Sequence, residues 1–159
     1  MVDPSSLYSV SVEAAVDPLG ADISALARLA ERVMAGEDLA QGTELAVLIT
    51  SDAEMQRMNL TFLGMDEPTD VLSFPDDSED FIEGEDAPPY LGDIAIGIEI
   101  AVRQAEEHTH SLDAELAHLL VHGVLHLCGY DHVTTPGDEA VMRAREEHYL
   151  GTLGHLHQH

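Results

Sequence analysis

The chain has 159 residues, a length that suits one domain with a buried core of its own. Hydrophobic residues make up 45% of the sequence, which is typical of a globular protein. No apolar run approaches the roughly 20 residues that a membrane span needs, so we expect no membrane association. The single cysteine, Cys128, excludes an internal disulfide framework and favours a reducing, cytoplasmic location.

The charge is the most unusual property of the sequence. Six arginines and no lysine stand against 31 acidic residues, which gives a formal net charge of −25. Such a surface repels nucleic acid at long range, because phosphate binding ordinarily depends on Lys and Arg. Composition alone therefore argues against a nucleic-acid-binding protein. It favours either a well-solvated surface or an acidic face that selects its partners.

Strands and helices alternate irregularly along the chain, with no internal repeat. Apolar residues at every second position predict strands, and apolar residues at helical spacing predict helices. We expect strands over 7–16, 45–50, 71–74 and 91–97. We expect helices over 22–34, 51–64, about 98–107, 112–128 and 137–150; the second has a capping box, Ser51 with Glu54, at its start. This mixture predicts a single α+β domain over residues 1–159 with one small sheet.

Two segments lie outside these elements. Residues 76–86 include seven acids and begin a long segment that we interpret as a solvated loop, with a lid over a site as the alternative. Residues 151–159 hold His155, His157 and His159. We expect this tail to be frayed and able to bind metal adventitiously.

The histidines between 118 and 132 carry the most specific pattern. His122 and His126 are four residues apart on the predicted helix 112–128, so they share one face and can chelate one ion as neutral imidazoles. Gly129 can end that helix in the left-handed conformation and let the chain bring His132 to the same ion. Three histidines with an open fourth position are typical of catalytic zinc. We therefore predict one zinc ion per chain, bound by His122, His126 and His132.

Neighbouring side chains are candidates for other roles. His118 shares the helical face, and we interpret it as a hydrogen-bonding neighbour rather than a fourth ligand. Cys128 lies off that face and is expected to pack as a small apolar group. Asp131 is either a turn residue or a carboxylate that handles a proton, which makes it the candidate catalytic side chain.

The histidine spacing also matches the metzincin peptidase pattern H-E-x-x-H-x-x-G-x-x-H. In those enzymes the second position is the glutamate that accepts a proton from zinc-bound water. Here it is Gly123, which has no side chain to do so. The sequence therefore argues against a zinc peptidase, which is kept as the less favoured alternative.

Four stretches of the chain resemble the YbeY family of bacterial metal-dependent endoribonucleases, which are rRNA maturation factors. They are MNLTFLGMDE (58–67), PTDVLSFP (68–75), LGDIAIG (91–97) and HGVLHLCGYDH (122–132), and the likeness extends over about 45–150. The resemblance implies a zincin-like α+β fold with zinc ligands at His122, His126 and His132. It also implies a zinc-dependent endoribonuclease that acts at the 3′ end of small-subunit ribosomal RNA and in ribosome quality control.

One position departs from the family pattern. Family members commonly carry an arginine where this chain has Leu63, so a phosphate clamp is missing from a chain already poor in cations. Arg57 and Arg103 are expected to be solvated. We therefore expect weak affinity for naked RNA, no DNA substrate, and delivery by a basic ribosomal or assembly-factor protein. The alternative function is a non-catalytic ribosome assembly factor whose zinc stabilises the fold.

Overall fold

The computed structural model describes residues 8–75, 89–130 and 136–156, and within them four strands and five helices. The strands are β1 (Ser9–Ala14), β2 (Glu44–Thr50), β3 (Val71–Pro75) and β4 (Tyr90–Gly97). The helices are α1 (Ile23–Gly36), α2 (Asp52–Leu63), α3 (Ile98–Glu107), α4 (Leu112–Leu127) and α5 (Pro136–Leu156). The acidic loop 76–86 lies outside the described residues.

The predicted elements are present, with one difference at the end of the chain. Ser51 caps α2 by accepting a hydrogen bond from the Glu54 amide, and Gly64 ends that helix at φ 74°. Helix α5, in contrast, continues to Leu156 instead of ending near residue 150. Gly151 does not end the helix, because a glycine inside a helix costs only about 1 kcal/mol relative to alanine. The predicted helix end near residue 150 is therefore wrong, because α5 includes the residues up to Leu156.

The four strands form one mixed sheet in the order β1-β2-β4-β3. β1 and β4 both run parallel to β2, whereas β3 runs antiparallel to β4 and forms an edge of the sheet. This arrangement confirms the predicted α+β class with a small mixed sheet. Within the described residues, no helix is long and apolar enough to cross a membrane.

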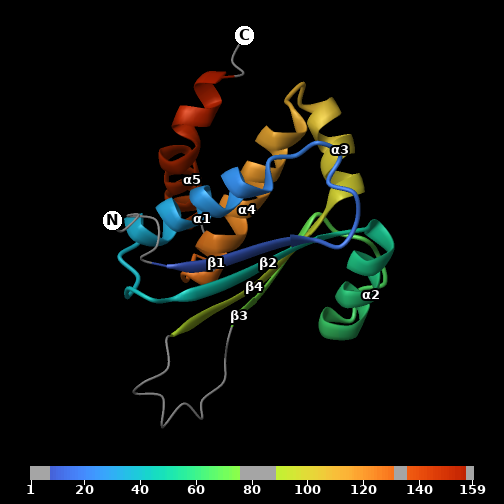
Figure 1. The fold of residues 1–159 in the computed structure, drawn as a ribbon, viewed down its shortest axis with the longest axis horizontal. Helices are drawn as coiled ribbons and strands as arrows, with labels where there is room; N and C mark the ends of the chain where they lie inside the picture. Colours follow the sequence, from blue (N-terminus) through green and yellow to red (C-terminus); the bar gives the residue numbers. More distant parts are fainter. Residues whose placement is uncertain (1–7, 76–88, 131–135, 157–159) are drawn as a thin grey trace.

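The two faces of the sheet are covered differently (Figure 1). Helices α1 and α4 pack on one face, with α5 against them, and alternate residues of β2 and β4 such as Val47 and Ile94 point into this main core. Helix α2 lies on the opposite side, where Met55 and Met58 pack on Leu72. One face is thus closed by a helical layer, and the other is only partly covered.

Helix α4 is the central helix of the covered face and packs very closely on β3 and β4. Its start is capped by Ser111, whose hydroxyl accepts a hydrogen bond from the Ala114 amide. At Gly123 the helix meets the sheet, and the Ser73 hydroxyl donates to the Gly123 carbonyl at 3.3 Å. This packing fixes the position of His122 and His126, which lie on either side of Gly123 in α4.

Candidate metal centre

His122 and His126 lie side by side on α4, as their spacing predicts. Their Nε2 atoms are 3.0 Å apart, and their ring centroids are 4.5 Å apart. A tetrahedral zinc ion with Zn–N bonds of about 2.0–2.1 Å holds two nitrogens about 3.3 Å apart. Both side chains are partly exposed, so an ion can reach them from solvent. The observed separation therefore suits two ligands of one metal ion.

Glu146, on α5, contacts the His122 ring at Nδ1, the nitrogen that does not face His126. Glu146 Oε2 lies 2.5 Å from His122 Nδ1, and Glu146 Oε1 lies 3.7 Å from His118 Nε2. An ionised carboxylate only accepts hydrogen bonds, so Nδ1 of His122 carries the proton. The lone pair of His122 is then on Nε2, the atom that faces His126. Such a carboxylate–histidine contact commonly orients a metal-ligating imidazole.

The electrostatics keep Glu146 ionised. Partial burial by itself would raise the pKa of Glu146, but its contacts with His118 and His122 lower it to about 2. The contact with Glu146 in turn raises the pKa of His118. His118 thus contacts the carboxylate of the centre at 3.7 Å, and its role as a hydrogen-bonding neighbour stays a prediction.

The predicted third ligand, His132, and the candidate catalytic residue, Asp131, lie outside the described residues and stay predictions. The chain is described up to Tyr130. It turns at Gly129, where φ is 111°, and the Tyr130 amide donates to the Leu125 carbonyl at 3.1 Å. This is the reversal that the sequence predicts after α4.

Cys128 is partly buried at the end of α4 and packs against the main core. Burial, with a smaller contribution from the charge of Glu37, raises the pKa of the Cys128 thiol to about 11. The expected role as a small packing group agrees with this environment.

Helix α5 is held in place by an ion-pair cluster around Glu37, the residue that caps the end of α1. Its carboxylate accepts hydrogen bonds from Tyr149 at 2.6 Å, from Arg145 at 2.5 and 3.1 Å, and from Tyr130 at 3.1 Å. Burial opposes ionisation of Glu37, but these donors lower its pKa overall. The cluster joins α1 to α5 and so helps to place Glu146, the next residue after Arg145.

Gly123 leaves no space for the base of a peptidase. A Cβ atom at this position would lie 3.1 Å from Ile94 Cδ1 and 3.3 Å from the Ser73 hydroxyl oxygen. A longer side chain would start against the sheet rather than beside the imidazoles. The packing of α4 therefore adds a physical reason to the sequence argument against a zinc peptidase.

A second group of possible metal ligands lies at the other end of α4, and the sequence analysis missed it. His108, His110 and Glu115 place one potential ligand atom each within 4.8 Å of one another. The pattern H-x-H-x4-E was present in the sequence. It crosses the boundary between two predicted helices, where no regular spacing brings side chains together.

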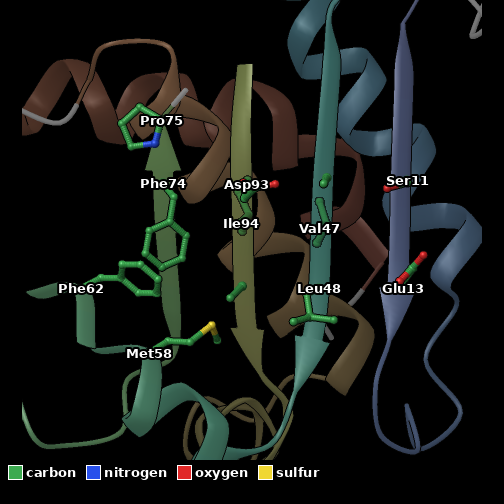
Figure 2. A pocket seen from close by; sticks show the side chains of 12 residues that line it. Ser11, Glu13, Val47, Leu48, Met58, Phe62, Phe74, Pro75, Asp93 and Ile94 are labelled. Carbon is green, nitrogen blue, oxygen red and sulfur yellow. The ribbon is translucent and has the colours of Figure 1, made fainter. Parts of the chain in front are cut away.

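A groove of about 780 Å³ lies on the less covered face of the sheet. Figure 2 shows Phe62 and Phe74 facing one another at one side of it, with a centroid distance of 5.2 Å, and Glu13 on β1 at the other. Asp93 also contributes to the lining. The lining does not include His122 or His126, and its carboxylates disfavour phosphate. Among the described residues, the groove and the metal centre therefore share no side chain.

The arginines near α2 pair with acidic side chains. Arg57 pairs with Glu54 on the same helix, and Arg103 Nη2 lies 3.0 Å from Asp52 Oδ2. Leu63, at the family's usual arginine position, is 58% exposed at the end of α2. Within the described residues, α2 and its surroundings thus offer little unpaired positive charge for a phosphate backbone.

Comparisons with known proteins place similar sequences in one family. The profile of a family described as Endoribonuclease YbeY matches residues 16–154. Several proteins named Endoribonuclease YbeY are similar to the chain. The protein of Roseiflexus castenholzii is 52% identical over 134 residues, which cover 84% of each protein. The protein of Chloroflexus aggregans is 49% identical over 140 residues, which cover 87% of this chain and 92% of the relative. The more distant Bacillus licheniformis protein is 42% identical over 136 residues, 83% of this chain and 85% of the relative.

A solved structure shares the fold. The solution structure of TM1509 from Thermotoga maritima aligns with a TM-score of 0.58 and 23% sequence identity, and the alignment covers 91% of each chain.

Proposed function

Because the chain belongs to the endoribonuclease YbeY family, we propose that it is a zinc-dependent endoribonuclease that acts in ribosomal RNA maturation. The 3′ end of small-subunit ribosomal RNA is the proposed substrate region, and ribosome quality control is the proposed cellular role. Such a substrate places the protein in the cytoplasm. The observation that supports this proposal most is the convergence of His122 and His126, backed by Glu146.

The chain supplies a ligand set that fits zinc. His122 and His126 would hold the ion through Nε2, and His132 is the proposed third ligand. Bound zinc lowers the pKa of a coordinated water toward ~7 and polarises a phosphoryl oxygen. Glu146 holds the proton on His122 Nδ1 and fixes the ring orientation. The nucleophile is either water or the 2′-hydroxyl of the RNA.

Glu146 is not suited to accept the proton of the nucleophile. Its carboxylate is engaged by His122 and His118, and these contacts lower its pKa, which weakens it as a base. Asp131 therefore remains the proposed proton-handling side chain.

The charge distribution supports delivery by a protein partner. Counterion release on neutralising phosphates dominates sequence-independent RNA binding, and this chain has six arginines and no lysine. Among them, Arg57, Arg103 and Arg145 are engaged by carboxylates. A basic ribosomal or assembly-factor protein would be attracted to the acidic surface and would bring the metal centre to the RNA.

The alternative function is a non-catalytic assembly factor in which zinc stabilises the fold. The charge of −25 favours it, and the ligand variants distinguish it from an enzyme. An enzyme with one changed ligand stays folded and loses cleavage, whereas a protein held together by zinc unfolds.

The test is cleavage of a ribosomal RNA fragment that spans the small-subunit 3′ end. The full chain should cleave it, a chelator should stop cleavage, and added Zn²⁺ should restore it. Circular dichroism should show that the chelated protein keeps its helices. Failure to cleave free RNA and RNA within small-subunit particles, with full zinc loading, would contradict the proposal. Chelator-sensitive hydrolysis of casein would instead favour a peptidase.

A further inference from the structure

We propose that His108, His110 and Glu115 form a second metal site, which takes a divalent cation of the zinc class. The site lies at the junction of α3 and α4 and is separate from the centre at His122 and His126. This inference goes beyond the proposed function, because it concerns different residues and does not depend on RNA cleavage.

The turn between the two helices brings both histidines to the same place. The Thr109 amide donates to the Glu106 carbonyl at 3.2 Å, and the His110 amide donates to the Ala105 carbonyl at 2.9 Å. These two bonds form a Schellman turn, in which the residue after the cap takes a left-handed conformation. Thr109 takes it, with φ 54°, although β-branched residues rarely do. The rings of His108 and His110 end with centroids 5.4 Å apart.

The carboxylate that these rings face is buried. Glu115 lies in the first turns of α4 and is 1% exposed. Its Oε1 lies 3.4 Å from His108 Nδ1 and 4.0 Å from His110 Nε2. A buried ionised carboxylate needs hydrogen-bonding or positively charged partners. The structure places the two imidazoles in that position, and a cation between the three groups would supply the charge.

The donor set and its dimensions suit a zinc-class ion. Two imidazoles and one carboxylate are ligands that zinc and neighbouring divalent transition metals accept. Tetrahedral ligand atoms lie about 3.3 Å apart, so the 3.4 Å distance already fits and the 4.0 Å distance must shorten slightly. The His108 and His110 side chains are 54% and 36% exposed, which leaves their rings room to rotate toward the ion.

The two centres are too far apart to share one ion. Glu115 precedes His122 by seven residues and His126 by eleven, which corresponds to about 10 and 16 Å along a helix. An ion at the second site would join the end of α3 to the start of α4. It would therefore hold the N-terminal end of α4, the helix whose C-terminal half carries His122 and His126.

The experiment is a zinc titration of the full chain, monitored by competition with a chromophoric chelator. His155, His157 and His159 are changed to Gln in every sample, to remove adventitious binding by the tail. This background should bind two zinc ions. His108→Ala with His110→Ala should remove one of them, and so should His122→Ala with His126→Ala. His148→Gln, an exposed histidine on α5, is the matched control and should leave both.

The outcomes separate this inference from the proposed function. Loss of zinc only with the His122 and His126 changes would overturn the second site and leave the proposed function intact. Loss only with the His108 and His110 changes would support the second site and contradict the catalytic centre. If the double variants do not fold, the unchanged background can be titrated with Ni²⁺ and followed by NMR of the histidine rings. Broadening of the His108 and His110 signals near one equivalent per site supports the inference, and its absence overturns it.

Discussion

Each end of helix α4 has two histidines and one glutamate, in different arrangements. Near its C-terminal end, His122 and His126 face each other, and Glu146 contacts the opposite nitrogen of His122. Near its N-terminal end, Glu115 is itself the centre, and both histidines approach one of its oxygens. In the first arrangement the carboxylate orients a ligand, and in the second it is a ligand. The position of the carboxylate therefore distinguishes the two sites. At His122 and His126 it leaves coordination positions on the metal open, whereas at Glu115 it would occupy one of them.

The two arrangements also differ in how they are assembled. The first depends on the docking of α5, because Glu146 lies 24 residues beyond His122 in the sequence. The second is contained within residues 108–115 and needs only the turn between α3 and α4. Changes that loosen α5 should therefore affect the first centre and spare the second.

The largest effect on binding is expected for Glu146→Gln. The change removes the charge that holds the proton on His122 Nδ1, so zinc affinity at the first centre should fall by about 10–100-fold. Affinity at the second site should not change. Competition with a chromophoric chelator measures both. Glu147→Gln, on an exposed neighbouring position, is the matched control. Equal affinity in Glu146→Gln and wild type would show that Glu146 does not orient the ligand.

Glu37→Gln should loosen α5 by weakening its hydrogen bonds to Arg145 and Tyr149. We expect the free energy of unfolding to fall by about 1–2 kcal/mol at pH 7. The pKa of Glu37 is lowered in the folded state, so its stabilisation is present above the unfolded value of 4.5 and is lost as the pH falls below it. We would measure urea unfolding of wild type and Glu37→Gln from pH 7 to pH 3. The difference between their free energies of unfolding should shrink as the pH falls. Asp38→Asn is the control, and a difference that grows in acid would contradict this account.

Gly123→Ala tests the close packing of α4 on the sheet between His122 and His126. The new methyl group meets Ile94 and Ser73 at 3.1–3.3 Å, and this crowding should exceed the gain in helix propensity. We expect a net loss of about 1 kcal/mol in the free energy of unfolding. Gly151→Ala, where a methyl group meets nothing within 4 Å, should stabilise slightly. Thermal unfolding of both variants measures the contrast, and stabilisation by both changes would refute the packing argument.

The smallest effect is expected for Leu63→Arg, which should leave both metal sites unchanged. It adds one cation at an exposed position, so RNA affinity should rise several-fold and the salt slope should increase by about 1. Fluorescence anisotropy over a salt series measures both quantities, with Leu63→Gln as the uncharged control. Tight binding by wild type with a steep salt slope would rule out delivery by a protein partner.

The sequence predicted those parts of the fold that depend on local signals. The cap at Ser51, the stop at Gly64 and the turn at Gly129 are each decided by a few neighbouring residues. The strand order β1-β2-β4-β3 depends on pairing between distant segments, for which no local pattern exists. The end of α5 was predicted too early, because Gly151 is as compatible with a helix interior as with a stop.

The candidate site divides in the same way. The pairing of His122 with His126 follows from the geometry of a single helix. Glu146 and Glu37 reach the site region from other helices, and the buried position of Glu115 beside His108 depends on the turn between α3 and α4. These contacts are made by tertiary packing, so residue spacing alone could not predict them.

The most direct test compares one histidine from each end of α4 in the same cleavage assay. Wild type, His126→Ala and His110→Ala are incubated with the ribosomal RNA fragment and one equivalent of Zn²⁺ per site. Circular dichroism confirms that each protein is folded. We predict that His126→Ala loses cleavage by at least about 100-fold, as expected when a metal ligand is removed, and that His110→Ala retains it. Full activity of His126→Ala, or loss of activity only in His110→Ala, would contradict the assignment of the catalytic centre to His122 and His126.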